Sequence, residues 1–288
     1  MLVPVYPAPS NKSTRTMKTL KISKPFPGYV NVIIDNPPLN LMDQQMLDDL
    51  QALTAQLEQD TEVKIVVFES ANPDFFMPHL DIAHLELLNL EPMPATGLLA
   101  WPDVALRLER APFTTIAKIR GRARGVGSEF VLAMDMRFAS TEKALLAQIE
   151  IGCGAFPGGG GIERLPKLIG RARALEVILS GQDYNADIAE RYGWVNRSVP
   201  DAELDGFVEN LASRIASFDA KPLAQAKTIV NERVGLPVVE ELASTERKFF
   251  EALGYPETQA RIQSLFESGL QTHDFEYNLA DNIYITKQ

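Results

Sequence analysis

Hydrophobic residues follow two different periods along the N-terminal part of the chain. Short runs rich in Val, Ile and Phe are typical of buried strands, and they occur at 19–23, 29–35 and 64–69. Between the last two runs, apolar residues recur at helical spacing from Met46 to Leu57, after the helix-capping residue Asp43. This spacing predicts a helix at 43–59. Strands that alternate with helices indicate a layered α/β core.

The C-terminal part of the chain has only the helical period. It predicts helices at 201–217, 221–233, 238–253 and 256–269, followed by an aromatic tail. Upstream, 101–110 also has helical spacing, whereas 85–99 contains Pro92 and Pro94 and is expected to be a mobile lid over a ligand pocket. The pattern divides the chain into an N-terminal extension (1–17), an α/β core that holds the active site (18–200) and a helical region (201–288).

A junction with two glycines follows the apolar strand expected at 113–119 and precedes a short apolar helix. Gly125 and Gly127 allow the backbone to bend tightly and to bring its N–H groups close to a ligand. Because a helix N-terminus has a partial positive charge and unpaired N–H groups, the junction suits a developing oxyanion. Glu129 lies in the first turn of this helix. It is either a catalytic carboxylate or an ordinary acid that the helix dipole stabilises.

The same order of strand, glycine-rich turn and helix occurs again at Glu150. Two carboxylates, each beside such a junction, are the groups that general acid–base chemistry on a small carbonyl substrate requires. The glycines 158–161 also suggest a phosphate-binding loop, but no Lys followed by Ser or Thr comes after them. No dinucleotide-binding glycine motif opens a strand–helix unit either. The two carboxylates therefore favour acid–base catalysis over nucleotide binding.

Six segments stand in a characteristic order and spacing: Asn36–Met42, Phe75–Ile82, Gly125–Glu129, Gln148–Gly161, Ala172–Gly181 and Ala189–Asn196. In this order and spacing they resemble the enoyl-CoA hydratase/isomerase (crotonase) superfamily. The resemblance implies an α/β fold, a crotonase-like spiral of repeated ββα units followed by a C-terminal helical region. It also implies that the helical region 201–288 supports a homotrimer, or a homohexamer made of two trimers.

The resemblance also implies roles for particular residues. Glu129 and Glu150 occupy the positions of the two glutamates that handle water in family hydratases. The backbone N–H groups of Leu80 and Val126 occupy the positions of the oxyanion hole, which holds the thioester oxygen. Residues expected to bind the substrate are Phe76, Pro78, His79, Gly127, Pro157 and Gly158. No metal and no cofactor is expected, since coenzyme A enters as part of the substrate.

These roles predict a hydro-lyase of fatty acid metabolism that adds water across the C=C bond of an α,β-unsaturated acyl-CoA thioester. The expected intermediate is an enolate, which an oxyanion hole stabilises. The alternatives on the same fold are an enoyl-CoA isomerase and an acyl-CoA hydrolase or decarboxylase. A non-catalytic scaffold, for example one that binds RNA, is the alternative of a different class. Phosphate-backbone binding needs a basic face, whereas this chain has a net charge of −10 and a pI of about 4.9.

Two segments depart from the family pattern. The sequence Pro78-His79-Leu80 replaces one that usually contains glycine, and Val126 replaces another glycine. Both changes keep a backbone N–H group but add bulk, so we expect an acyl group other than a short linear one. His79 is either a packed or surface imidazole, or it contacts the substrate or acts as an auxiliary acid or base.

Arginine alternates with glycine and alanine just before the Glu129 junction. We expect Arg120, Arg122 and Arg124 to pair with acids at the surface or in a subunit contact; the alternative partners are a substrate carboxylate or a CoA phosphate. The three histidines lack metal-ligand spacing. The single cysteine, Cys153, is expected to be a packing residue and suits a reducing compartment.

Membrane and targeting signals are weak in this sequence. No apolar run reaches the length of about 18 residues that a membrane-spanning helix needs. The N-terminal segment is basic and contains serine, like a transit peptide, but it lacks an amphipathic apolar stripe. We therefore expect a cytoplasmic protein, with the mitochondrial matrix as the alternative, and an N-terminal extension that lies on a partner surface.

Overall fold

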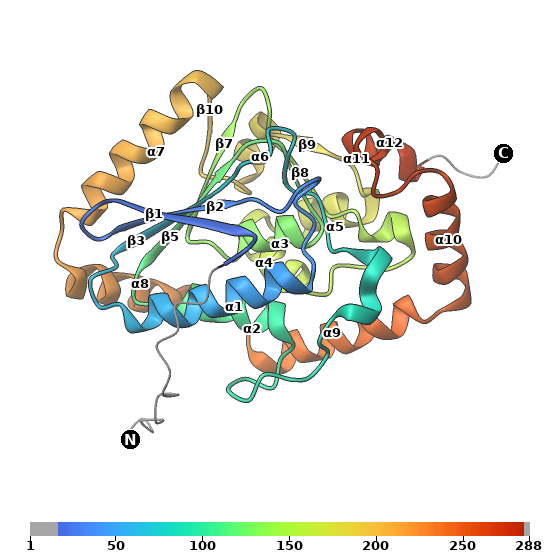
Figure 1. Cartoon of the computed structure of the whole chain (residues 1–288), viewed down its shortest axis with the longest axis horizontal. Helices are drawn as coiled ribbons and strands as arrows, with labels where there is room; N and C mark the ends of the chain where they lie inside the picture. The colour runs from blue at the N-terminus through green and yellow to red at the C-terminus, as the bar shows by residue number, and fades with distance from the viewer. Residues whose placement is uncertain (1–16, 285–288) are drawn as a thin grey trace.

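The computed structural model in Figure 1 describes residues 17–284. The predicted N-terminal extension therefore lies outside the described residues, except for Met17. The first elements are β1 (Leu20–Phe26), β2 (Tyr29–Ile34), α1 (Gln44–Gln59) and β3 (Ile65–Ser70). Asp43 caps α1 by accepting a hydrogen bond from the Met46 N–H group at 2.8 Å. The strands and the helix predicted for this part of the chain are confirmed, with small differences at their ends.

Two sheets form the centre of the molecule. The larger has six strands in the order β1-β2-β3-β5-β7-β10, of which β5 is Thr114–Ile119, β7 is Met136–Ser140 and β10 is Arg197–Val199. The smaller has four strands in the order β4-β6-β8-β9, which are Phe75–Met77, Arg122–Arg124, Leu145–Ala147 and Tyr184–Asn185. Within residues 17–284, β1–β2 and β8–β9 pair antiparallel and the other neighbours pair parallel.

Consecutive strands enter the two sheets in turn. The strands β3, β5 and β7 are neighbours in the larger sheet, and the strands that follow them, β4, β6 and β8, are neighbours in the smaller one. The helical segments between β4 and β10 are η1 (Ile82–Leu87), α2 (Ala100–Arg110), α3 (Val126–Leu132), η2 (Glu150–Cys153), α4 (Gly161–Ile169), α5 (Arg171–Ser180) and α6 (Ala186–Tyr192). Each pair of strands with its helical segment is one turn of a spiral. The predicted spiral of ββα units is therefore confirmed.

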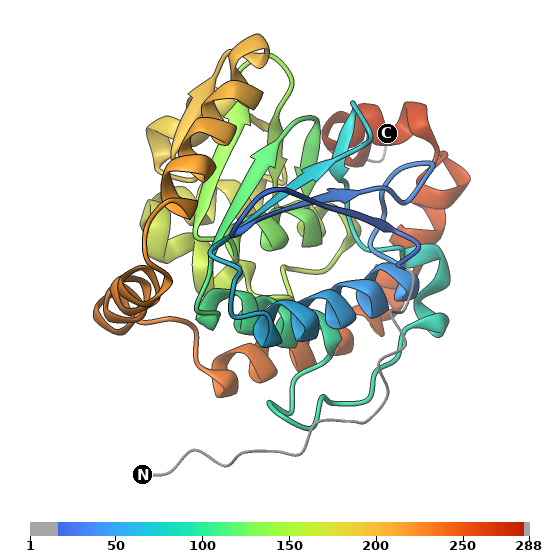
Figure 2. The same cartoon turned by 60° about the vertical axis from the view of Figure 1, so that its left-hand side comes forward.

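The strand β3 is buried on both faces, which explains its unbroken apolar sequence from Ile65 to Phe68. Ile65 and Val67 pack with α7 (Asp201–Ala216), which covers one face of the larger sheet in Figure 2. Val66 and Phe68 belong to the main hydrophobic core, which they share with α1, α2 and α3. This core holds α3, and with it Glu129, rigidly against the sheet.

Helices continue from α7 to the end of the described chain, as the sequence predicts. They are α8 (Ala220–Val234), α9 (Val239–Leu253), α10 (Pro256–Glu267), α11 (His273–Tyr277) and α12 (Leu279–Tyr284). The last two form from the segment in which the sequence indicates only an aromatic tail. Side chains of α10, α11 and α12, among them Leu265, Phe275 and Ile283, pack against Ile149. The end of the helical region therefore lies next to Glu150.

The arginines of the 120–124 stretch differ in their surroundings. Arg120 pairs with acids of α7 near the surface, as predicted. Arg124 is fully buried and pairs with Asp183 at 2.5 Å, and Arg122 is 8% exposed and stacks on the Tyr277 ring. The surface location predicted for Arg122 and Arg124 is wrong. The reason is that the C-terminal helices, which local sequence does not place, cover β6.

Candidate active site

One cleft gathers most of the residues predicted for the site. It encloses about 1020 Å³ of space, counted out to its open mouth. The predicted residues that line it are His79, Leu80, Val126, Glu129, Glu150 and Gly158. Its other walls come mainly from 82–102, from 149–155 and from α9, and they are mostly apolar. A concave, apolar site with a few converging polar groups is typical of small-molecule binding.

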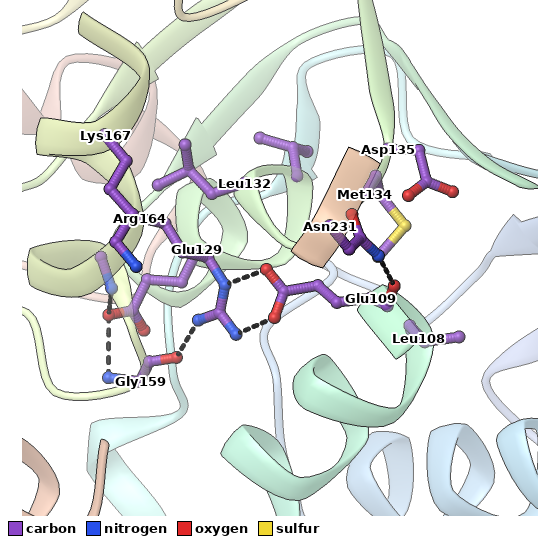
Figure 3. Close-up of polar contacts among 12 residues, drawn as sticks. Leu108, Glu109, Glu129, Leu132, Met134, Asp135, Gly159, Arg164, Lys167 and Asn231 are labelled. Carbon is purple, nitrogen blue, oxygen red and sulfur yellow. Dashed lines mark hydrogen bonds and ion pairs between the residues drawn. The ribbon is translucent and has the colours of Figure 1, made fainter. Parts of the chain in front are cut away.

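Glu129 lies in the first turn of α3, and its carboxylate is buried against the glycine turn 158–161 (Figure 3). Its Oε1 atom accepts hydrogen bonds from the N–H groups of Gly159 at 2.8 Å and Gly161 at 2.9 Å. Burial raises the pKa of Glu129 to about 7, although these N–H groups and the Arg164 charge oppose the rise. A carboxyl group with a pKa near neutrality suits general acid–base catalysis.

Glu150 is the first residue of η2, directly beyond β8. Its Oε2 atom is buried and has no hydrogen-bond partner among residues 17–284. Burial and the nearby Glu129 carboxylate raise the pKa of Glu150 well above its ordinary value. Because two neighbouring carboxylates repel each other, ionisation of one favours a proton on the other. The pair can therefore accept one proton and donate another.

Two backbone N–H groups at the cleft are free to bind a ligand. The backbone hydrogen bonds to Met42 are made by the two residues on either side of Leu80. The Met42 N–H donates to the His79 carbonyl oxygen at 3.0 Å, and the Asp81 N–H donates to the Met42 carbonyl oxygen at 2.9 Å. Val126 is the first residue of α3, so its N–H has no intrahelical acceptor. Neither Leu80 nor Val126 donates a backbone hydrogen bond to the described part of the chain. Both are available to a ligand oxygen, as an oxyanion hole requires.

The glycines 158–161 hold Glu129 rather than a phosphate. A Cβ atom at Gly159 would overlap Glu129 Oε2 and the ring nitrogen of Trp101. Gly160 has a φ of 111°, in the left-handed region that favours glycine. Glycine at these positions therefore lets the backbone approach the carboxylate closely.

A buried ion pair supports the glycine turn from behind, as Figure 3 shows. Arg164 of α4 makes two hydrogen bonds of 2.8 Å to the carboxylate of Glu109 in α2. Its Nη1 group also donates to the carbonyl oxygen of Gly159 at 3.3 Å. Arg164 and Glu109 are only 4% and 7% exposed. This bidentate pair fixes the turn whose N–H groups bind Glu129.

His79 is packed against the C-terminal helices while it lines the cleft. Its Nε2 atom lies 3.1 Å from Oε1 of Glu276 in α11, and its Nδ1–H donates to the Leu80 carbonyl oxygen at 2.6 Å. Burial lowers the pKa of His79, but the Glu276 carboxylate outweighs this effect, so the pKa is raised. The ion pair connects α11 to His79, and His79 in turn holds the Leu80 carbonyl group. Contact between His79 and a substrate stays a prediction.

Four residues predicted to bind the substrate lie behind the cleft wall. Phe76 is fully buried in the main core, and Pro78 and Pro157 are also buried. A Cβ atom at Gly127 would overlap the Met77 carbonyl oxygen, so Gly127 allows α3 to pack closely on β4. Among the described residues that line the cleft, Phe76, Pro78, Gly127 and Pro157 are absent. Their position indicates that they shape the wall, and contact between them and a substrate stays a prediction.

The sequence analysis did not identify the residues that α2 and α9 contribute to the cleft. Trp101 of α2 lines it, and the Nε1–H group has no partner among residues 17–284. Glu246, Phe249 and Phe250 line it from α9. Their spacing places them on one helix face. An acid within such an apolar face is the signal that could have indicated a ligand site.

The predicted lid does border the cleft. Leu88, Asn89, Leu90 and Leu99 line it after the short turn η1. The segment thus has the position of a lid, and its mobility stays a prediction.

Other chemistry has little support at this site. Burial raises the pKa of Cys153 to about 12, so its thiol is protonated at neutral pH and is a poor nucleophile. Residues 17–284 contain no group of three or more His, Cys, Asp or Glu side chains that could hold a metal ion.

In the same residues, no helix is both long enough and apolar enough to span a membrane.

An α/β spiral brings two carboxyl groups and two free backbone N–H groups to one cleft, an arrangement suited to acid–base chemistry beside a carbonyl group. The model of the enoyl-CoA hydratase/isomerase family matches residues 28–272, and the chain belongs to this family. It is 29% identical over 242 residues to the short-chain-enoyl-CoA hydratase of Clostridium acetobutylicum, covering 83% of this chain and 92% of that relative.

Solved structures show the same likeness. A protein of Streptomyces avermitilis, provisionally named an enoyl-CoA hydratase, is 39% identical with a TM-score of 0.87, and the match covers 96% of this chain and 99% of the other. The enoyl-CoA hydratase of Bacillus anthracis is 25% identical with a TM-score of 0.70, covering 87% of this chain and 97% of the other. The predicted family and fold are therefore confirmed.

Proposed function

We propose that the protein is a hydro-lyase that adds water across the C=C bond of an α,β-unsaturated acyl-CoA thioester. The observation that supports this most directly is that two buried carboxyl groups and two free N–H groups border one cleft. Relatives that are named enoyl-CoA hydratases support the same reaction. Coenzyme A would enter as part of the substrate.

In the proposed reaction, the thioester oxygen accepts hydrogen bonds from the N–H groups of Leu80 and Val126. Water attacks C3, a C–O bond forms, and the electrons of the C=C bond move through C2 onto the thioester oxygen as an enolate. Negative charge thus develops where the two donors lie, and a preorganised donor of this kind contributes about 2.7–4 kcal/mol. Collapse of the enolate and protonation at C2 complete the addition.

The two glutamates would divide the proton transfers. Glu129 accepts hydrogen bonds from two backbone N–H groups, which stabilise its anion. It is therefore the proposed base that takes a proton from water. Glu150 has a buried oxygen without a partner in the described chain, so it is the proposed group that keeps a proton and delivers it to C2. The net result is one water added and no proton gained or lost by the pair.

A panel of enoyl-CoA thioesters, followed by the absorbance of the conjugated alkene, tests the proposal. We expect the absorbance to fall as the hydroxyacyl product forms. If saturating enzyme hydrates no ester, the alternatives take its place, and their products distinguish them. A shifted alkene indicates an isomerase, a free CoA thiol indicates a hydrolase, and released CO₂ indicates a decarboxylase.

The charges in the structure do not favour the RNA-binding alternative. In the basic 118–124 stretch, Lys118 and Arg120 pair with acids, and Arg122 and Arg124 are buried. A polarisation titration with RNA at two salt concentrations tests this class. Sub-micromolar, salt-sensitive binding that survives Glu129→Gln would favour the scaffold over the enzyme.

An exposed apolar row on α8 and the following loop supports the predicted homo-oligomer. Ile229, Val230, Val234 and Val238 are 52%, 58%, 67% and 47% exposed. The helix projects from the edge of the molecule in Figure 2 and contains no buried residue. Contiguous exposed apolar side chains often mark a protein interface. We propose a trimer, alone or paired as a hexamer, which sedimentation velocity would distinguish from a monomer.

We expect kcat/KM to fall as the pH drops below about 7. Burial raises the pKa of Glu129 to about 7, and a base must be ionised to take a proton from water. Because neighbouring carboxyl groups titrate together, the apparent pKa belongs to the pair. The pKa of Glu246 is also raised to about 7, so Glu246→Gln is the control and should keep this acid limb. Loss of the limb in Glu246→Gln would contradict its assignment to Glu129.

We expect His79→Ala to lower kcat about tenfold, with little change in KM. The change removes the link between Glu276 and the Leu80 carbonyl group, so the neighbouring oxyanion donor is held less firmly. The loss should be smaller than the 10²–10³-fold effect that is typical of removing such a donor altogether, so about tenfold is a reasonable scale. Glu276→Gln keeps a hydrogen-bonding group and should lose less. A rise in KM with unchanged kcat would instead assign His79 to substrate binding.

A further inference from the structure

Glu246 in α9 carries a carboxyl group that the proposed reaction does not use. It lines the cleft, although the residue is only 8% exposed. Among the described residues, its only hydrogen bond comes from the Leu99 N–H group, at a long 3.4 Å. Most of the hydrogen-bonding capacity of Glu246 is therefore available to a ligand.

The surroundings of Glu246 make an unliganded carboxyl group costly. No Lys or Arg of the described chain lines the cleft. Burial raises the pKa of Glu246 to about 7, so both protonation states are present near neutral pH. Buried carboxyl groups are rare unless they are paired, and an unpaired one in a cleft indicates a functional site.

The position of Glu246 relates it to the reacting groups. Phe249 and Phe250 follow at i+3 and i+4, so they share its helix face, and both rings line the cleft. A Cβ atom at Gly158 would overlap the Phe249 ring. The helix α9 therefore packs directly on the glycine turn that binds Glu129. Glu246 and the two rings border the same side of the cleft as this turn.

Charge decides which part of a CoA ester can meet Glu246. Coenzyme A carries phosphate groups, which a carboxylate repels. The Arg247 charge lowers the pKa of Glu246 but does not outweigh burial, and Arg247 does not line the cleft. The acyl group carries no such charge, and Trp101, Phe249, Phe250 and Leu253 offer it apolar walls. A hydroxyl group both donates and accepts a hydrogen bond, so it can pair with the carboxyl group in either protonation state. It also adds no charge to an apolar cleft.

We propose that Glu246 binds a hydroxyl group on the acyl part of the substrate. The preferred acyl group then has an apolar body, which the aromatic rings hold, and a hydroxyl substituent that reaches α9. This inference rests on the proposed acyl-CoA function. It specifies the acyl group as an apolar one with a hydroxyl substituent, in place of the short linear acyl group of a generic hydratase.

The test uses pairs of enoyl-CoA esters of increasing chain length that differ only by a terminal methyl or hydroxyl group. For at least one pair, we expect the wild type to have a kcat/KM about 10- to 100-fold higher with the hydroxyl ester, the range for one hydrogen bond to an ionisable group. Glu246→Leu should lose this preference and still hydrate the methyl esters, and Glu246→Gln should keep part of it. Glu251→Leu, which changes an exposed glutamate of the same helix, is the matched control and should keep the full preference.

Calorimetric binding of the corresponding saturated acyl-CoA pairs separates this inference from the proposed reaction. If no ester is hydrated, but the wild type binds the hydroxyl ester more tightly and Glu246→Leu does not, the reaction fails and the hydroxyl subsite stands. If the wild type hydrates both members of every pair equally, the reaction stands and the subsite is overturned. If Glu246→Leu is less stable but keeps the preference for the hydroxyl ester, Glu246 serves only to stabilise the start of α2 through the Leu99 N–H group. That result would also overturn the subsite.

Discussion

We expect Glu129→Gln and Glu150→Gln each to lower kcat by about 10²–10⁴, the usual contribution of a positioned acid or base. Glutamine keeps the size of the side chain, and at position 129 it keeps an acceptor for the Gly159 and Gly161 N–H groups. It cannot take a proton from water or give one to C2. Substrate binding should therefore change little, and steady-state kinetics on the best ester should show the loss in kcat and not in KM.

The controls for this experiment separate chemistry from folding. Glu190→Gln changes an exposed glutamate of α6 and should have the wild-type kcat. The double variant of Glu129 and Glu150 should lose little more than the worse single variant, because residues that act as a unit have non-additive effects. A wild-type kcat in either single variant would remove that carboxyl group from the proposed reaction.

Arg164→Met is expected to lower the free energy of unfolding by about 3–5 kcal/mol, the typical result of breaking a buried ion pair from one side. The change leaves the Glu109 carboxylate buried without the two hydrogen bonds of 2.8 Å that it now accepts. It also removes the donor to the Gly159 carbonyl oxygen, so the turn that binds Glu129 is less well held. Urea unfolding of the purified protein measures the difference.

The same variant should move the pH profile. The Arg164 charge lowers the pKa of Glu129, against the larger effect of burial that brings it to about 7. Without this charge the pKa rises, so the acid limb of kcat/KM should move to higher pH. An unchanged limb would show that Arg164 does not influence the reacting carboxyl group.

Two further variants serve as controls for Arg164→Met. Lys24→Met breaks the exposed pair with Asp60 and should change the free energy of unfolding by at most about 1 kcal/mol. The double variant Arg164→Met/Glu109→Leu has no unpaired buried charge, so it should recover much of the lost stability. It should nevertheless keep the shifted pH limb. Wild-type stability in Arg164→Met alone would contradict the structural role of the pair.

Local patterns in the sequence predict most elements of the fold. The cap at Asp43, the helical spacing that follows it and the unbroken apolar run of β3 each act over a few neighbouring residues. The same is true of the glycine turns beside Glu129 and Glu150. The resemblance of six ordered segments added the spiral, since short-range patterns do not state which strands become neighbours.

Long-range packing explains what the sequence analysis missed. Arg124 is of a residue type usually found at the surface, but it is fully buried. Its guanidinium pairs with Asp183 and donates to the carbonyl oxygen of Glu276 in α11. Phe76 was expected at the substrate, but it belongs to the core behind the cleft. Glu246 was not identified, because α9 approaches the glycine turn only in the folded chain.

By itself, the sequence determined the longer helices and strands and the two glutamates that lie beside glycine-rich turns, because these properties depend on near neighbours. Only the tertiary structure decided that Glu129, Glu150 and Glu246 share one apolar cleft. It also decided their proton affinities, because burial by distant segments raises the pKa of all three carboxyl groups. The physical reason is that a carboxyl group takes its chemistry from its surroundings, and those surroundings exist only once the chain has folded.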